Sequence, residues 1–215
     1  MKKLTLLYCL IIVLHFAAYT QNPDTYFAKA CELVIEGHYS KAIKYFSKTI
    51  DINPDYDWAY LNRASAYTLR GNYSKAIQDY SRYLAFDPEN PGALESRGIL
   101  YVETNQPDLA IEDLNIALSY HPESFYLNFY LGMAYYIKEE YKTAIDYFNI
   151  YLENNGIEWE TYYYMSLCYQ KLEKNSESCK YANMSYESLN SDFELVIKDH
   201  KKEYKALKKL IVQCN

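Results

Sequence analysis

The first candidates for chemistry in this chain are carboxylate side chains that lie close together in the sequence. Residues 51–57 alternate acidic and amide side chains as a calcium-binding loop does, but Tyr56 and Asn62 stand where such a loop needs glycine and glutamate. Glu95 and Glu103 could act as an acid–base pair, yet one helix would hold them about 12 Å apart, too far to share a proton. The carboxylates therefore predict neither a metal site nor a catalytic pair.

Nucleophile and nucleotide-binding motifs give no better candidate. The sequence contains no Gly-x-Ser-x-Gly, no His-Glu-x-x-His and no phosphate-cradling glycine loop, and it has only 6 glycines. His38, His121 and His200 lie far apart in the sequence. We therefore expect no enzyme activity, no cofactor and no metal.

Thiol chemistry has one candidate, a disulfide near the carboxyl end. The chain has 5 cysteines, of which Cys9 falls in an apolar leader. If the C-terminal helix folds back antiparallel, Cys214 returns to Cys179, and this is the pairing that we favour. A Cys168–Cys179 pair and free thiols throughout are the alternatives, while Cys31 fits a buried apolar position. Without Cys-x-x-Cys spacing, zinc is not indicated.

A 34-residue repeat defines the elements that position these residues. Small residues recur at that interval in two registers, and a tyrosine-rich series and a proline series follow in phase. The four series are Ala30, Ala64, Gly98, Gly132, Ser166; Ala42, Ala76, Ala110, Ala144, Ser178; Leu33, Tyr67, Tyr101, Tyr135, Tyr169; and Pro54, Pro88, Pro122. A period of this length indicates stacked helical hairpins, because paired helices approach closely only where one side chain is tiny.

One repeat, residues 57–90, shows how the elements are built. Apolar and small residues follow a helical period over residues 58–70, and Gly71 then supplies a left-handed turn. A second helical stripe begins near Ser74, which fits an N-cap or first-turn position, and ends before Pro88. The unit is therefore helix, tight turn, helix and short loop.

The order of small residue, tyrosine, glycine, tyrosine, alanine, aromatic residue and proline resembles the tetratricopeptide (TPR) repeat. The second repeat shows it most fully, in Ala64, Tyr67, Gly71, Tyr73, Ala76, Tyr80 and Pro88. The resemblance implies an all-α fold, a right-handed α-solenoid of about five stacked antiparallel helix pairs over residues 21–192. The repeats are 23–56, 57–90, 91–124, 125–158 and 159–192, and a C-terminal capping helix follows at residues 193–215.

One second-helix position departs from the TPR pattern, which usually keeps it small. It holds Thr49, Tyr83, Ala117, Tyr151 and Ser185. We expect the two tyrosines to alter the packing between neighbouring repeats, so the pattern leaves the curvature of the superhelix open.

The amino-terminal segment indicates export. Residues 1–20 have the form of a signal peptide, with Lys2 and Lys3 before an apolar run at residues 4–19. That run is shorter than the roughly 20 residues that a membrane-spanning helix needs. We expect a periplasmic, envelope-associated or secreted protein with no integral membrane segment in the mature chain. An uncleaved anchor and a lipid attached at Cys9 are the alternatives.

Net charge narrows the partners. The chain carries a net charge of −6, which becomes more negative when the lysines of the leader are removed. An acidic chain without a basic block is not suited to nucleic acid or anionic lipid. The lysines of the C-terminal helix are interleaved with acids and fit a solvated helix face. We therefore expect a protein or peptide partner.

The TPR resemblance places the partner-binding groove on the first helix of each pair. The groove positions are Phe27, Trp58, Leu61, Ser65, Glu95, Ile99, Tyr126, Phe129, Met133, Tyr136 and Tyr163. This set is rich in aromatic residues and poor in charge, which suits an extended or helical peptide held by side-chain anchors. The same tyrosines could instead fill a tight superhelix, and the sequence leaves both interpretations open.

These features predict a non-catalytic protein–protein interaction scaffold of the bacterial cell envelope that binds a partner peptide of unknown identity. The alternative is an accessory, chaperone-like factor in the assembly of outer-membrane or surface proteins. A stable partner that co-purifies would favour the scaffold, and many weakly bound clients the accessory. An enzyme has the least support, because repeat folds bind and the residues offer no acid–base or metal set.

Overall fold

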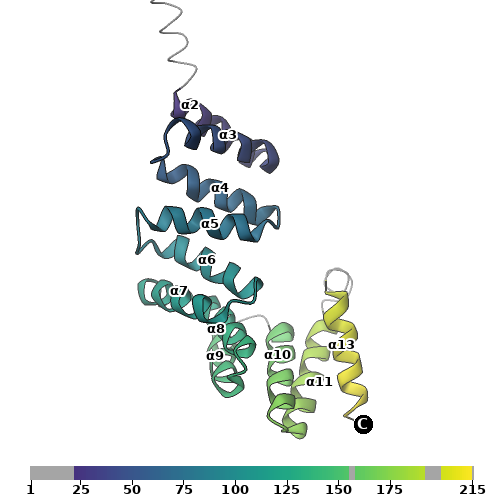
Figure 1. Ribbon diagram of the computed structural model, residues 1–215. Coiled ribbons are helices and arrows are strands. Elements are labelled where there is room, and N and C mark those ends of the chain that lie inside the picture. Colours follow the sequence, from purple (N-terminus) through teal and green to yellow (C-terminus); the bar gives the residue numbers. More distant parts are fainter. Residues whose placement is uncertain (1–21, 155–157, 192–199, 215) are drawn as a thin grey trace, which may run out of the picture. The chain divides into compact units, whose positions relative to one another are not determined.

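The computed structural model describes residues 22–154, 158–191 and 200–214, and within them every regular element is an α-helix (Figure 1). The helices are α2 (Pro23–Ile35), α3 (Tyr39–Ile52), α4 (Asp57–Leu69), α5 (Tyr73–Leu84), α6 (Pro91–Glu103), α7 (Pro107–Tyr120), α8 (Tyr126–Ile137), α9 (Tyr141–Glu153), α10 (Glu158–Lys171), α11 (Asn175–Ser191) and α13 (Lys201–Val212). The predicted all-α fold is confirmed. The leader predicted at residues 1–20 lies outside the described residues. Among the helices described, none has both the length and the apolar character needed to cross a membrane.

The chain divides into two compact units, Met1–Ala93 and Leu94–Asn215, with the boundary inside α6. In the first unit α2 pairs with α3 and α4 with α5, and α3 packs on α4. In the second unit α8 pairs with α9 and α10 with α11, and α9 packs on α10. Each unit therefore stacks helical hairpins, as the 34-residue period predicts.

Tight turns join the two helices of each pair. Gly37 and Gly71 have φ angles of 75° and 69°, in the left-handed region that glycine adopts without a steric penalty. Asn105, Glu139 and Glu173 occupy the equivalent positions of the later pairs with φ angles of 60°, 65° and 59°. The turn geometry is thus kept in the later pairs without glycine.

Proline marks the helix boundaries less uniformly than the sequence suggests. Pro107 opens α7 at its first turn, where its missing N–H costs nothing. By contrast, α5 ends at Leu84, before Asp87 and Pro88. Helix α5 thus stops a few residues before the point at which the proline alone would end it.

Small residues lie where paired helices approach each other. Ala64 of α4 and Ala76 of α5 are fully buried. At Gly132 of α8 an added Cβ would lie 2.5 Å from the ring of Phe148 on α9, and at Gly98 of α6 it would lie 2.8 Å from Leu114 on α7. The third and fourth pairs therefore leave no room for a side chain at this position.

The second-helix position that departs from the TPR pattern contacts the start of the first helix of its own pair. Thr49 and Ser185 donate to the carbonyl oxygens of Pro23 and Trp159, at 3.4 and 2.6 Å. The larger Tyr83 is 2% exposed, and its ring centre lies 6.0 Å from that of Trp58. A tyrosine at this position therefore fills space between the paired helices.

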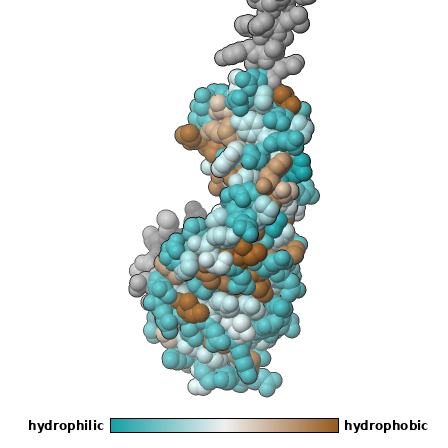
Figure 2. Space-filling model, turned by 90° about the vertical axis from the view of Figure 1, so that its left-hand side faces the viewer, coloured by the Kyte–Doolittle hydropathy of each residue, from teal (hydrophilic) through white to brown (hydrophobic). Residues whose placement is uncertain are grey.

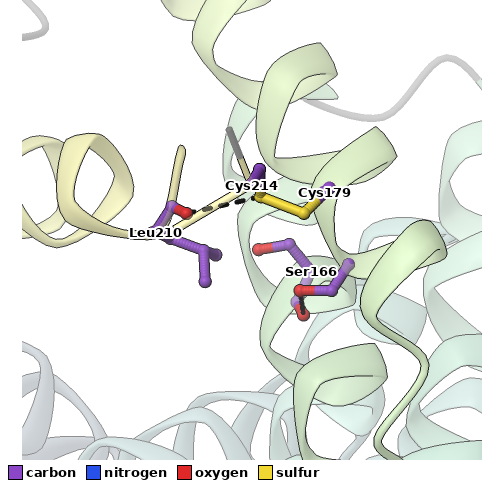
Figure 3. Close-up of a disulfide and its surroundings, with 5 residues drawn as sticks. Ser166, Cys179, Leu210 and Cys214 are labelled. Atoms are coloured by element: carbon purple, nitrogen blue, oxygen red, sulfur yellow. Dashed lines mark hydrogen bonds between the residues drawn. A yellow bond between two sulfur atoms is a disulfide. The ribbon is translucent and has the colours of Figure 1, made fainter. Parts of the chain in front are cut away.

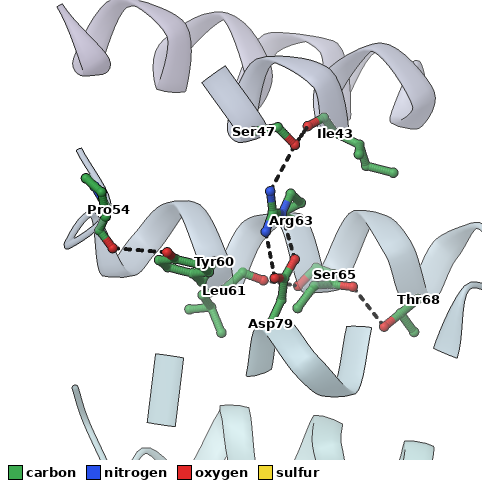
Figure 4. A network of polar contacts seen from close by, with 10 residues as sticks. Ile43, Ser47, Pro54, Tyr60, Leu61, Arg63, Ser65, Thr68 and Asp79 are labelled. Atoms are coloured by element: carbon green, nitrogen blue, oxygen red, sulfur yellow. Dashed lines mark hydrogen bonds and ion pairs between the residues drawn. The ribbon is translucent and has the colours of Figure 1, made fainter. Parts of the chain in front are cut away.

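Two buried ion pairs link the paired helices in the middle of the chain. Arg63 of α4 binds Asp79 of α5 through Nε and Nη2, at 2.7 and 2.8 Å, and reaches Ser47 of α3 with Nη1 at 2.9 Å (Figure 4). Arg97 binds Asp113 in the same bidentate way, at 2.7 and 2.8 Å. Each pair joins two helices at one register of the repeat.

Helix α13 closes the second unit. Its Leu207 and Leu210 pack with Trp159 of α10 and Leu189 of α11 in one apolar cluster. The capping helix predicted at residues 193–215 is thus present from Lys201 to Val212, and residues 193–199 lie outside the described residues.

A disulfide joins α13 to the preceding hairpin. Cys179 of α11 is bonded to Cys214, with the two Cα atoms 5.6 Å apart (Figure 3). This is the pairing that the sequence favours. Cys168 is a buried free thiol, so the alternative Cys168–Cys179 bond is not formed. Burial raises the pKa of the Cys168 thiol to about 12.

Candidate functional site

The predicted groove residues lie on first helices of the pairs, and the two units divide them. Phe27 is on α2, and Trp58, Leu61 and Ser65 are on α4, all in the first unit. The remaining seven are on α6, α8 and α10 in the second unit: Glu95, Ile99, Tyr126, Phe129, Met133, Tyr136 and Tyr163. The structure therefore presents two faces, one on each unit.

The face of the first unit is apolar. Trp58 is 53% exposed, and Ile35 and Leu69, at the ends of α2 and α4, are 88% and 59% exposed. Phe27 is half-buried against Phe46 and Tyr56, with ring centres 5.6 and 5.0 Å away. Figure 2 shows one side of the chain, on which apolar residues are set among hydrophilic ones. On this unit the most exposed large apolar side chains thus belong to the first helices.

Polar groups of the first-unit face are satisfied within α4 and α5. Ser65 donates to the carbonyl oxygen of Leu61 at 3.1 Å, and its hydroxyl lies 3.2 Å from that of Tyr80. Leu61 is half-buried. These residues offer contact area to a ligand rather than a reactive group.

Tyrosine rings cover the corresponding helices of the second unit. Tyr130 of α8 lies 5.6 Å from Phe129, and Tyr164 of α10 lies 6.2 Å from Phe129 and 5.6 Å from Tyr136. Tyr163 lies 5.5 Å from Tyr164. The rings of α8 and α10 thus form one contiguous cluster.

Two predicted groove residues serve the core of that cluster. Phe129 is only 9% exposed and packs on Phe148 and Tyr151. Met133 is half-buried against the same apolar core. The ring of Phe129 therefore fills space between the helices.

Carboxylates from α6 and α10 approach these tyrosines. Tyr126 of α8 donates its hydroxyl hydrogen to the carboxylate of Glu95 on α6, and burial and this bond both raise the pKa of Tyr126. Burial and the nearby carboxylates of Glu103 and Glu160 raise the pKa of Tyr130. We call Glu95, Glu103, Tyr126, Tyr130, Glu160 and Tyr164 the acidic tyrosine face.

The surroundings of Glu160 shift the pKa of its carboxyl group upward. Burial raises its pKa, and the like charges of Glu203 and Glu103 raise it further, while His200 acts in the opposite direction. The ring of Trp159 holds His200 nearby, with ring centres 4.8 Å apart. The second unit thus places further carboxylates, those of Glu103, Glu160 and Glu203, beside a predicted set that is itself poor in charge.

Tyr130, Tyr164 and Glu160 belong to this face but are not among the residues predicted from the sequence. A signal for them exists in the repeat, because Tyr126 and Glu160 share one register and Tyr130 and Tyr164 share another. The convergence of Glu103 with Glu160 has no such signal, since it depends on how α6 and α10 pack beside α8. In the described part of the chain, no group of three His, Cys, Asp or Glu side chains is arranged to hold a metal ion.

The fold and these faces define a class of helical-hairpin repeat proteins that present first-helix surfaces. Family models described as tetratricopeptide repeat match residues 23–56, 58–90 and 96–156. The chain therefore belongs to the tetratricopeptide repeat family. The repeats of this family act as interaction modules.

Solved structures share the fold. YrrB, described as a TPR protein with an unusual peptide-binding site, is 17% identical, with a TM-score of 0.72 over 89% of this chain and 97% of that chain. MamA from Desulfovibrio magneticus RS-1 is 15% identical, with a TM-score of 0.72 over 80% of this chain and 97% of that chain. MamA of MSR-1 is 23% identical, with a TM-score of 0.70 over 77% and 95%. A search of curated protein sequences gives no match.

Proposed function

We propose that this chain is a non-catalytic scaffold of the bacterial cell envelope that binds a segment of a partner protein on its first helices. The observation that carries the proposal is the exposure of large apolar and aromatic side chains on those helices, with Trp58 53% exposed on α4. The description of YrrB as peptide-binding supports the same use of a similar fold.

Export of the chain is part of this proposal. The leader at residues 1–20 supports it, and so does the Cys179–Cys214 disulfide, because such bonds persist in oxidising compartments. Amino-terminal sequencing of the protein from a periplasmic fraction should begin at Gln21. A chain found in the cytosol with Met1 intact would contradict export.

Site-specific crosslinking tests the binding surface. We expect a photoreactive residue at Trp58 or Tyr126 to capture the same partner in the native host, because both positions lie on first helices. Ile116 of α7 and Ile150 of α9 are the matched controls, since they are 37% and 42% exposed on second helices. Capture at Ile116 and Ile150 but not at Trp58 and Tyr126 would overturn the proposed surface.

The number of captured proteins separates the scaffold from the accessory factor. One partner recovered in stoichiometric amount favours the scaffold. Several outer-membrane or surface proteins recovered weakly favour an assembly factor. Both results are consistent with the proposed binding surface, and they differ in the lifetime of the complex.

A further inference from the structure

The acidic tyrosine face uses two equivalent registers of two consecutive first helices. Tyr126 and Glu160 occupy one register of α8 and α10, and Tyr130 and Tyr164 occupy another. The two helices contact each other. Aromatic rings and carboxylates therefore lie side by side on one continuous surface of the second unit.

Carboxylates converge on this surface from three helices, α6, α10 and α13. Glu95 and Glu103 of α6 and Glu160 of α10 all act on Tyr130, and Glu203 of α13 acts on Glu160 and Tyr164. The basic group among these interactions is the imidazole of His200. The local field is therefore negative.

Three acids elsewhere in the same unit are paired with a basic side chain of the chain itself. Asp113 is bound by Arg97, and Asp108 and Glu140 both lie close to the ammonium group of Lys138, at 3.1 and 3.2 Å. Among the described ion pairs, no lysine or arginine partner is found for four carboxylates, those of Glu95, Glu103, Glu160 and Glu203. A basic group of another molecule could therefore pair with these carboxylates, which lie beside the tyrosine rings.

The tyrosine rings show the same contrast. Lys208 lies 4.7 Å from the ring of Tyr204, and Arg97 lies 5.6 Å from the ring of Tyr101. Within the described residues, no such cation lies over the rings of Tyr126, Tyr130 or Tyr164. These tyrosines are half-buried, so each keeps exposed surface that a cation could contact.

Glu160 adds an argument from stability. A raised pKa means that the folded protein disfavours the ionised carboxylate relative to the unfolded chain. Bringing a positive charge to Glu160 would relieve this penalty. A charged group kept where it lowers stability is typical of a functional site.

We propose that the acidic tyrosine face binds a cationic segment of a partner protein, with arginine preferred to lysine. A guanidinium group can stack on a tyrosine ring and pair bidentately with a carboxylate, whereas an ammonium group offers a point charge. The inference rests on the proposed function and names the chemistry of its partner.

Peptide binding to the full chain tests this inference. The probes are fluorescein-labelled peptides of equal length that alternate serine with arginine, lysine or glutamate, and fluorescence anisotropy gives their affinities. We expect the arginine peptide to bind most tightly, the lysine peptide more weakly and the glutamate peptide not at all. Added salt should weaken the binding, because the attraction is electrostatic.

Matched charge variants locate the binding. We expect Glu160→Gln and Glu103→Gln each to weaken binding of the arginine peptide by about tenfold, because each removes one charge beside the tyrosines. Glu153→Gln is the control, since Glu153 is exposed on α9, a second helix, and its loss changes the net charge equally. Binding should be unchanged in that variant.

A stability measurement separates lost binding from lost folding. Because the pKa of Glu160 is raised in the folded state, its ionised form costs stability above that pKa, and the cost vanishes below the unfolded-state pKa of about 4.3. Glu160→Gln should therefore raise the thermal midpoint at neutral pH, with a gain that shrinks near pH 4. Weaker binding by a more stable variant supports a binding role.

Three results would overturn the inference. One is equal affinity for the arginine and glutamate peptides, or no binding of either. Another is an equal loss of binding in Glu153→Gln and Glu160→Gln. The third is a dimer in sedimentation that Glu160→Gln dissociates, because the occupant would then be a second copy of this chain. In the first two cases, crosslinking of a partner at Trp58 and Tyr126 would still support the proposed function. If no partner is crosslinked at these positions, both the inference and the proposed function are wrong.

Discussion

At the scale of single residues, the chain solves one packing problem in two ways. The register that holds Arg63 and Arg97 holds Leu131 and Met165 in later repeats, and the aspartates that bind those arginines are replaced there by Tyr147 and Tyr181. Tyr147 stacks on Tyr135 with ring centres 5.3 Å apart, and Tyr181 stacks on Tyr169 at the same distance. Ion pair and tyrosine stack thus join the same two helices.

This exchange predicts the result of a double substitution. Asp79→Leu should cost about 3 kcal/mol of unfolding free energy, because it leaves the guanidinium of Arg63 largely buried without its carboxylate. Arg63→Leu together with Asp79→Tyr imitates the fourth repeat and should recover most of that loss. Urea unfolding followed by circular dichroism measures both.

The exposed pair between Arg82 and Asp55 provides the control for that experiment. Its atoms lie 3.8 Å apart and Asp55 is 81% exposed, so Asp55→Ala should change stability by less than about 0.5 kcal/mol. If the double variant is less stable than Asp79→Leu alone, the tyrosine arrangement cannot replace the ion pair, and the proposed equivalence is wrong.

At the scale of helices, the packing of two paired helices depends on the side chain that contacts a glycine of the partner helix. In the fourth repeat Phe148 is fully buried against Gly132, with Phe129 and Tyr164 packed around the same ring. The equivalent contact in the first two repeats is made by Ala30 and Ala64. The missing side chain at Gly132 therefore makes room for the ring of Phe148.

Gly132→Ala should destabilise the protein by about 1–3 kcal/mol, because the new methyl group overlaps a ring that has no room to move. Gly92→Ala is the control, since its added Cβ would meet only Asn90 Oδ1, at 3.7 Å. We expect that variant to be neutral or slightly more stable, since alanine favours the helix. Equal midpoints for the two variants in thermal unfolding would show that the α8–α9 contact is not tight.

At the scale of the whole molecule, the 34-residue period predicts the helices more completely than it predicts the binding surface. Small residues at a fixed interval can mean only close helix pairs, so the hairpins follow from residues such as Ala64 and Ala76. The left-handed turns at Glu139 and Glu173 could not be predicted, because glutamate gives no local signal for a positive φ angle and the preceding helices impose it. The charge of the acidic tyrosine face was missed for a related reason. It arises where helices distant in the sequence converge, and each glutamate alone fits a solvated position.

The disulfide makes a prediction that distinguishes the two units. It closes a loop with a sequence separation of 35, for which chain entropy alone gives a stabilisation of about 3–4 kcal/mol. Cys214→Ser should therefore increase hydrogen exchange in α13, which loses its covalent tether, and in α11, against which Leu207 and Leu210 pack. It should leave α2–α5 of the first unit unchanged.

Burial of the Cys168 thiol keeps it from forming a replacement bond, so the variant measures the loss of one tether only. Cys31→Ser, at a half-buried free thiol of the first unit, is the control and should leave α13 protected. If Cys214→Ser exposes α2–α5 as much as α13, the stability of the two units is coupled, and the disulfide supports more of the chain than the helix that it joins.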